Sequence, residues 1–292
     1  MSKRFRKIVE DVYILETPLG DIWSGVVFVD GKDRILIDSG DKAKVVDECI
    51  IPALADLGYT LNDISWLCNT HCHGDHVGGN HRIKELSKVK VAAYSVAAPK
   101  VRDPLKYSKQ IRAAYPNYSP APPPVLLGVE PDLILEDGDL IGQRLQVIAA
   151  PGHDTDSVCF YDTKTKTLIT GDSFQGNGAI VQGLALYMDL QQYRMTLSRM
   201  KTLDIENIVS GHPYLFCGDC ALGKDEAIKY IARCEEIIEI YGNYIKDQVD
   251  KGITDTVTIA EGLIAHMKNH RPAFVFQALY TVDAHLREMG IK

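Results

Sequence analysis

Thr70-His71-Cys72-His73-Gly74-Asp75-His76-Val77-Gly78-Gly79 is the segment from which the architecture of this chain can be inferred most directly. It places three His and one Asp within six residues, and it follows an apolar run over 64–69 that predicts a buried strand. Three further side chains of the same kinds also follow short apolar runs that end in small residues. They are His153 after Pro151-Gly152, Asp172 after Thr170-Gly171 and His212 after Ser210-Gly211. All seven are therefore expected at strand ends that face one cleft.

These five His and two Asp offer the mixture of imidazole nitrogen and carboxylate oxygen that zinc, iron or manganese accept. Seven donors exceed the needs of one tetrahedral ion and suit two. Two ions about 3.5–4 Å apart can share a hydroxide and polarise the scissile oxygen of a substrate. The pattern therefore predicts a hydrolase that needs no Ser or Cys nucleophile. Zinc is the expected metal, with iron or manganese as alternatives, because no Cys stands among the donors to favour one ion.

The composition limits the possible partners. The chain has 292 residues, 46% of them apolar, which is enough to bury a large core. Its 32 basic and 39 acidic residues give a net charge of −7, which argues against nucleic acid as a partner because phosphate binding needs a basic surface. No apolar run approaches the roughly 20 residues that cross a bilayer, and no signal peptide is recognisable. With an odd number of Cys, a cytoplasmic protein without a membrane partner is expected; it acts on a small molecule, and a homodimer is left open.

Strand and helix patterns alternate along the first part of the chain, and helical patterns continue from residue 225 almost to the end. The segment 95–128 interrupts the alternation. Its run 115–124 excludes interior helix and central strand, because proline lacks an amide donor and fixes φ. This segment is expected as a rigid surface linker or as a loop that borders the cleft. Strands are expected at 12–15, 25–30, 34–38, 64–69, 89–94, 133–135, 145–149, 158–161, 167–170 and 207–210, and helices at 43–57, 80–86, 189–203, 225–247, 257–268 and 272–288.

The set His-x-His-x-Asp-His, Pro-Gly-His, Gly-Asp and Gly-His, in this order over about residues 10–215, resembles the metallo-beta-lactamase superfamily. The resemblance implies an α/β fold, an αββα sandwich of two mixed β-sheets flanked by helices. Residues 1–224 would form the catalytic domain, and 225–292 a C-terminal helical extension packed on it. Asp38, at the end of the apolar run 35–37, would lie behind a ligand His, on the side away from the metal, and orient its ring. The resemblance implies one metal held by His71, His73 and His153, and a second held by Asp75, His76 and His212, with Asp172 bridging both.

Within that superfamily the segment 171–212 looks like the thioesterase and lactonase branches. The expected reaction is attack of a metal-bridging hydroxide on a small thioester, ester or lactone, with Asp75 orienting the nucleophile or accepting its proton. Lactonases often carry a Tyr shortly after the bridging Asp, but Phe174 follows here, and Tyr187 is the candidate substitute. Trp23 is a candidate apolar lid over the substrate. The alternatives are a beta-lactamase or phosphodiesterase of the same fold and, in another class, a metal-binding protein without catalysis.

Cys217 and Cys220 have the CxxC spacing of redox and zinc sites, but the second Cys pair of a zinc site is missing. An ordinary loop with two thiols is expected, and an oxidisable gate over the cleft is the alternative.

Overall fold

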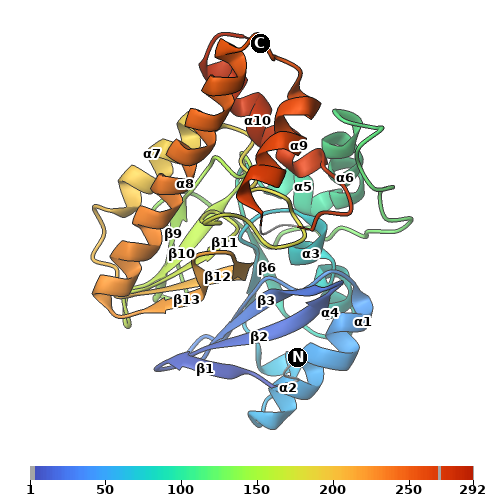
Figure 1. Ribbon diagram of the computed structural model, residues 1–292. Coiled ribbons are helices and arrows are strands. Elements are labelled where there is room, and N and C mark those ends of the chain that lie inside the picture. Colours follow the sequence, from blue (N-terminus) through green and yellow to red (C-terminus); the bar gives the residue numbers. More distant parts are fainter. Residues whose placement is uncertain (1–3, 269–270, 292) are drawn as a thin grey trace.

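Two β-sheets are stacked face to face, and helices cover their outer faces (Figure 1). The computed structural model describes residues 4–268 and 271–291. The first sheet runs in the order β1-β2-β3-β4-β5-β6-β7, antiparallel from β1 to β4 and parallel from β4 to β7. Its strands are β1 (Arg6–Val9), β2 (Val12–Leu19), β3 (Ile22–Val29), β4 (Ile35–Ile37), β5 (Trp66–Cys68), β6 (Lys90–Tyr94) and β7 (Leu133–Leu135).

The second sheet runs in the order β13-β12-β11-β10-β9-β8. Its neighbours are antiparallel except for β11 and β12, which are parallel and are joined by a helical crossover. Both sheets are therefore mixed. The strands are β8 (Leu140–Ile141), β9 (Leu145–Ala149), β10 (Val158–Asp162), β11 (Thr167–Gly171), β12 (Asn207–Tyr214) and β13 (Gly218–Leu222).

The helices fall into two groups along the chain. Those that follow β4 to β6 are α1 (Ala43–Val45), η1 (Val46–Ile50), α2 (Ile51–Asp56), η2 (Leu61–Asp63), α3 (Gly74–Val77), α4 (Asn80–Leu86), α5 (Ala98–Arg102) and α6 (Pro104–Ala113). Those that follow β11 are α7 (Leu190–Met200), α8 (Lys224–Asp250), α9 (Thr256–Met267) and α10 (Phe276–Glu288). None of the helices in the described ranges has the length and apolar character needed to cross a membrane.

Alternation along the strands creates the layers, because successive side chains of a strand point to opposite faces. On β3, Val27 and Val29 enter the core between the two sheets, whereas Val26 and Phe28 pack on the outer face with α1 to α6. On the second sheet, Phe160 faces the other sheet, and its neighbour Cys159 faces the helices α7 to α10. The chain thus has three apolar layers, as a helix–sheet–sheet–helix sandwich requires.

The predicted αββα sandwich is confirmed, and so are the helices of the C-terminal extension. These helices share one apolar core with the second sheet, through side chains such as Tyr241 and Leu279. The domain boundary at residue 224 stays a prediction.

Three strands (β1, β8 and β13) and four helices (η2, α3, α5 and α6) of the described residues were not predicted. β1, β8 and β13 are short, and their exposed residues break the apolar pattern. Cys217 is buried in the turn before β13, as a loop position predicts, whereas Cys220 lies on β13 itself, so the prediction of an ordinary loop was wrong for Cys220.

The segment 95–128 begins with α5 and α6, so it is neither a linker nor a loop over its first half. The side chain of Asp103 caps α6 by accepting a hydrogen bond from the amide of Lys106 at 3.0 Å, and Pro104 occupies the first helical turn. This Asp-Pro pair is a helix start signal that the Pro-rich run downstream outweighed.

Candidate metal centre

The seven predicted donors come together where the two sheets meet. His71 and His73 follow β5, His153 lies in the turn after β9, Asp172 follows β11 directly, and His212 lies within β12. Asp75 and His76 lie on the short helix α3. The donor atoms form two groups whose members lie within 4.8 Å of one another: His71, His73, His153 and Asp172 in the first, and Asp75, His76 and His212 in the second.

In the first group, three imidazole nitrogens converge. His153 Nε2 lies 3.3 Å from His71 Nε2 and 3.1 Å from His73 Nδ1. Asp172 Oδ2 lies 3.8 Å from His153 Nε2 and 3.4 Å from His212 Nε2. The Asp172 carboxylate therefore reaches both groups, as a bridging ligand must.

In the second group, His76 and His212 present their Nε2 atoms to each other at 3.4 Å. Asp75 Oδ2 lies 3.4 Å from His76 Nε2 and 3.1 Å from His212 Nε2. The other oxygen of Asp172 completes the arrangement, at 3.3 Å from His76 Nε2. The Nε2 atoms of His76 and His212 thus each face the carboxylates of Asp75 and Asp172.

The outward-facing nitrogens of these rings are held by the protein, which fixes the ring orientations. His212 Nδ1 donates to the carbonyl of Trp23 at 2.7 Å, and His153 Nδ1 donates to the carbonyl of Leu186 at 2.8 Å. His71 Nδ1 lies 3.1 Å from the hydroxyl of Thr70. With the outer nitrogens of His71 and His153 engaged in this way, their inner nitrogens are left with lone pairs that point at the centre.

Asp38 lies behind His76, where the resemblance places it. Asp38 Oδ2 is 2.8 Å from His76 Nδ1, and the carboxylate also accepts hydrogen bonds of 2.8 Å from both the amide and the hydroxyl of Thr70. Its backbone has a φ of +64°, a left-handed conformation that Asp tolerates better than most residues. Such a conformation costs free energy and persists where surrounding contacts fix it, as the hydrogen bonds of this carboxylate do.

Asp154, which was not identified from the sequence, lies beside the outer nitrogen of His73. Its Oδ2 lies 3.5 Å from His73 Nε2 and also accepts a hydrogen bond from Tyr107. Its Oδ1 accepts from Lys100 Nζ at 2.8 Å, and Lys100 also binds Asp156 at 2.7 Å. Lys100 and Tyr107 come from α5 and α6. These helices were not predicted from the sequence, so this network could not be predicted either.

The electrostatics differ between the two groups. Burial, together with the neighbouring His rings, lowers the pKa of His71 well below its usual value and those of His73 and His153 to about 4 each. These three rings are therefore neutral near pH 7 and can act as ligands. Burial alone would also lower the pKa of His212, but the carboxylates of Asp172 and Asp75 raise it to about 10.

The residues present fit a pair of divalent cations. Asp172 Oδ1 is buried and accepts no hydrogen bond within the described part of the chain, although His76 lies close by. A buried carboxylate oxygen without such a partner is costly, and a cation would offset that cost. Neutral His nitrogens and ionised Asp oxygens are also the donor types that zinc, iron and manganese share.

Gly211 is required by the close packing of these donors. A Cβ at this position would lie 2.5 Å from Asp172 Oδ1 and 3.0 Å from His76 Cε1. We expect Gly211→Ala to displace both ligands and to lower the bound metal by about one equivalent per chain, measured by elemental analysis. Gly242→Ala is the matched control, because its Cβ would meet nothing closer than 3.5 Å. Unchanged metal content in Gly211→Ala would contradict this assignment of the donors.

Metal binding is expected to release protons. With a pKa of about 10, His212 is protonated at neutral pH, and a cation must displace that proton to bind its Nε2. Affinity should therefore rise with pH, by about tenfold per pH unit for each proton displaced. Calorimetry in two buffers of different ionisation enthalpy, at pH 6 to 8, measures the number of protons released. A release of zero on metal binding across this range would contradict the displacement of a proton from His212 by a cation.

The three residues predicted to touch substrate pack against the apolar cores of the structure. Phe174 and Tyr187 are wholly buried in the core beside the second sheet, where the hydroxyl of Tyr187 lies 2.7 Å from His285 Nε2. Both side chains are fully buried, and a contact with substrate stays a prediction for them. The side chain of Trp23 packs on the core between the sheets, and it is the backbone carbonyl of Trp23 that serves the site.

A cavity of about 90 Å³ lies beside the donors. His73 and Asp75 form part of its wall, and most of the remaining wall comes from segments that supply no donor. These are Tyr107, Ser108, Ile111 and Arg112 of α6, Leu186 and Met188, and Phe276 and Gln277 of α10, with Cys72 and Gly74 from the motif itself. Both the segment 95–128 and the C-terminal helices therefore border the cavity.

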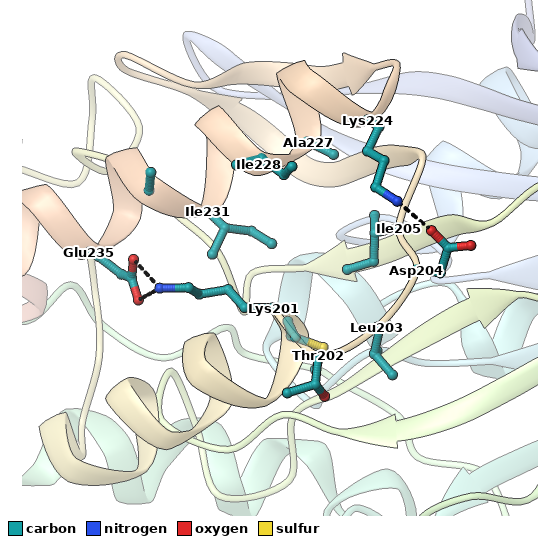
Figure 2. A pocket seen from close by; sticks show the side chains of 12 residues that line it. Lys201, Thr202, Leu203, Asp204, Ile205, Lys224, Ala227, Ile228, Ile231 and Glu235 are labelled. Carbon is teal, nitrogen blue, oxygen red and sulfur yellow. Dashed lines mark hydrogen bonds and ion pairs between the residues drawn. The ribbon is translucent and has the colours of Figure 1, made fainter.

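A larger cavity, of about 560 Å³, lies away from the donors between the end of α7 and the first turns of α8. Figure 2 shows that its apolar lining is flanked by two ion pairs, Lys201 with Glu235 at 3.0 Å and Lys224 with Asp204 at 2.9 Å. Since it contains none of the seven donors, size alone does not identify the reactive site.

Comparison with known proteins agrees with this geometry. The model of the metallo-beta-lactamase superfamily matches residues 18–212, more than half of the 292 residues. A beta-lactamase-like protein 2 homolog of Caenorhabditis elegans is 29% identical over 187 residues, covering 62% of this chain and 52% of the relative. The acyl-coenzyme A thioesterase MBLAC2 of Bos taurus is 29% identical over 153 residues, covering 49% of this chain and 54% of the relative. The chain spans about half the length of these relatives.

Among solved structures, a metallo-beta-lactamase family protein of Thermus thermophilus is similar with a TM-score of 0.72 and 18% identity, covering 97% of this chain and 95% of that chain. At this identity the likeness concerns the fold alone. The family match also concerns the site, because it extends from β2 to His212 and so includes all seven donors. On these grounds the chain belongs to the metallo-beta-lactamase superfamily.

Proposed function

We propose that the chain is a metal-dependent hydrolase that holds two divalent cations, with zinc as the expected metal, and cleaves a small thioester, ester or lactone. The observation that carries the proposal is the convergence of five His and two Asp into two adjoining donor groups beside a small cavity. Support for a thioester comes from relatives named acyl-coenzyme A thioesterase in Bos taurus and Homo sapiens, each 29% identical over 153 residues.

Divalent cations bound at these donors would supply activated water at neutral pH and polarise the substrate carbonyl. The residues of the chain perform the remaining tasks. Asp75 belongs to the second donor group and also lines the cavity, and we assign to its carboxylate the roles of orienting the attacking water and accepting its proton. Ile111 and Phe276 form apolar parts of the wall and limit the access of bulk water, which strengthens electrostatic interactions inside the cavity.

The proposal is tested by elemental analysis of the purified protein beside a hydrolysis panel of thioesters, esters, lactones, a beta-lactam and a phosphodiester. We expect two metal equivalents per chain and turnover of a thioester, ester or lactone. Turnover confined to the beta-lactam or to the phosphodiester would replace the proposed substrate class with that one. Two bound metals without turnover of any compound would favour the metal-binding protein without catalysis, and less than one metal after reconstitution with zinc, iron or manganese would refute the dinuclear site.

A further inference from the structure

Arg112 is a cationic side chain in the wall of the small cavity, on the last turn of α6. Its Nη1 donates to the carbonyl of Ser108 at 2.9 Å and to the hydroxyl of Ser108 at 2.7 Å. Those two bonds hold the guanidinium of Arg112 beside Ser108, one helical turn earlier on α6. The orientation of Arg112 is therefore set by the protein before any substrate arrives.

The rest of this guanidinium is not satisfied by the protein. Arg112 Nε is buried and has no hydrogen-bond partner among the described residues. Burial lowers the pKa of Arg112, and the Asp75 carboxylate counteracts this. A buried N–H group of a permanently charged side chain is costly when it is unpaired, and the Nε edge of a guanidinium matches the two oxygens of a carboxylate. The unpaired edge thus has the chemistry of an anion-binding group.

The neighbours of Arg112 hold it against the C-terminal helices. Tyr280 of α10 donates a hydrogen bond to the carbonyl of Ile111 at 2.6 Å, and the Tyr115 and Tyr280 rings meet edge to face at 5.1 Å. The Arg112 guanidinium lies 6.0 Å from the ring centroid of Phe276, which also lines the cavity. Two segments far apart in sequence therefore fix this cation in a wall of the same cavity as His73 and Asp75.

We propose that Arg112 binds a carboxylate on the acyl group of the substrate, so that the site prefers short acyl groups that end in a carboxylate. This inference rests on the proposed function. The cavity of about 90 Å³ is well below the roughly 300–1,000 Å³ of pockets that enclose drug-sized ligands, so it suits a short acyl chain and not a bulky phosphorylated leaving group. The anion is therefore assigned to the acyl side of the scissile bond.

The test uses the metal-reconstituted protein and thioesters of one small thiol, N-acetylcysteamine. Succinyl and glutaryl thioesters are compared with butyryl and pentanoyl thioesters, which have the same chain lengths without the charge. We expect kcat/KM to be at least about tenfold higher for one of the acidic substrates than for its neutral partner, as a charge-assisted hydrogen bond provides. Arg112→Met should remove that preference, so that acidic and neutral thioesters of the same chain length are hydrolysed with about equal kcat/KM.

Lys109→Met is the matched control, because it removes one positive charge from the exposed side of the same helix. It should keep the preference. Equal or lower kcat/KM for both acidic substrates in the wild type, or a preference that survives Arg112→Met, would overturn the inference. Butyryl-coenzyme A is compared with the butyryl thioester of N-acetylcysteamine, and a gain for coenzyme A that Arg112→Met abolishes would also overturn the inference.

A binding measurement separates this inference from the proposed function. Calorimetry with succinate and glutarate should show binding to the wild type that is at least about tenfold weaker in Arg112→Met. If no thioester is hydrolysed but this difference is found, the proposed function fails and the anion site stands. If neutral thioesters are hydrolysed and no such difference is found, the function stands and the anion site is refuted.

Discussion

Replacing Asp172 with Asn is expected to lower kcat/KM by about a thousandfold or more, because it removes the carboxylate that reaches both donor groups. The two oxygens of Asp172 lie 3.3 Å from His76 Nε2 and 3.4 Å from His212 Nε2, so a neutral amide with one poor donor atom weakens both groups at once. Several kcal/mol of charge stabilisation by bound metal correspond to about this factor in rate. Steady-state kinetics on the substrate found in the panel, together with elemental analysis, measures the effect.

Asp21→Asn is the matched control, since Asp21 is exposed in the turn between β2 and β3. It should leave activity and metal content unchanged. An Asp172→Asn protein with two metal equivalents and full activity would show that Asp172 is not a bridging ligand.

Asp38→Ala should weaken metal binding about 10–100-fold, as is typical when the partner that orients a ligand His is lost. It should also lower the free energy of unfolding, because the amide and hydroxyl of Thr70 and His76 Nδ1 all lose a buried acceptor. Each buried donor left unpaired costs about 1–3 kcal/mol. Metal titration followed by chelator competition, and denaturant unfolding of the metal-free protein, measure the two effects separately.

Asp38→Asn distinguishes orientation from stability. Asn tolerates the left-handed backbone at this position and keeps an oxygen for Thr70. It should therefore recover most of the free energy of unfolding that Asp38→Ala loses, while metal affinity stays reduced because a neutral amide polarises His76 less. If Asp38→Ala bound metal as tightly as wild type, Asp38 would have only a structural role.

The donor segments could be predicted from sequence because each donor follows an apolar run typical of a buried strand, and the end of such a strand lies at an edge of the sheet. Apolar runs such as 64–69 predicted strands, and side chains that follow such strands gather at one edge of a sheet. The seven donors were expected to converge, and the structure brings them together. That they hold metal stays a prediction.

The surroundings of the donors were less predictable because they depend on tertiary contacts. The carbonyl of Trp23 holds His212, but every residue has a carbonyl, so no sequence signal marks this one. Phe174 and Tyr187 stand near Asp172 in sequence yet point into the core, since nearness in sequence does not fix the direction of a side chain. Asp154 contacts His73 together with side chains from α5 and α6, which the Pro-rich run after them had concealed.

The wall of the cavity and the metal donors come from different parts of the chain. The donors lie on strand ends and on α3, whereas α6 and α10 supply much of the wall and none of the donors. Mutations on those two helices can accumulate during evolution without changing a single donor. Descendants of such a chain could therefore acquire new substrates by exchanging a few wall side chains, while natural selection preserves the same hydrolytic machinery beneath them.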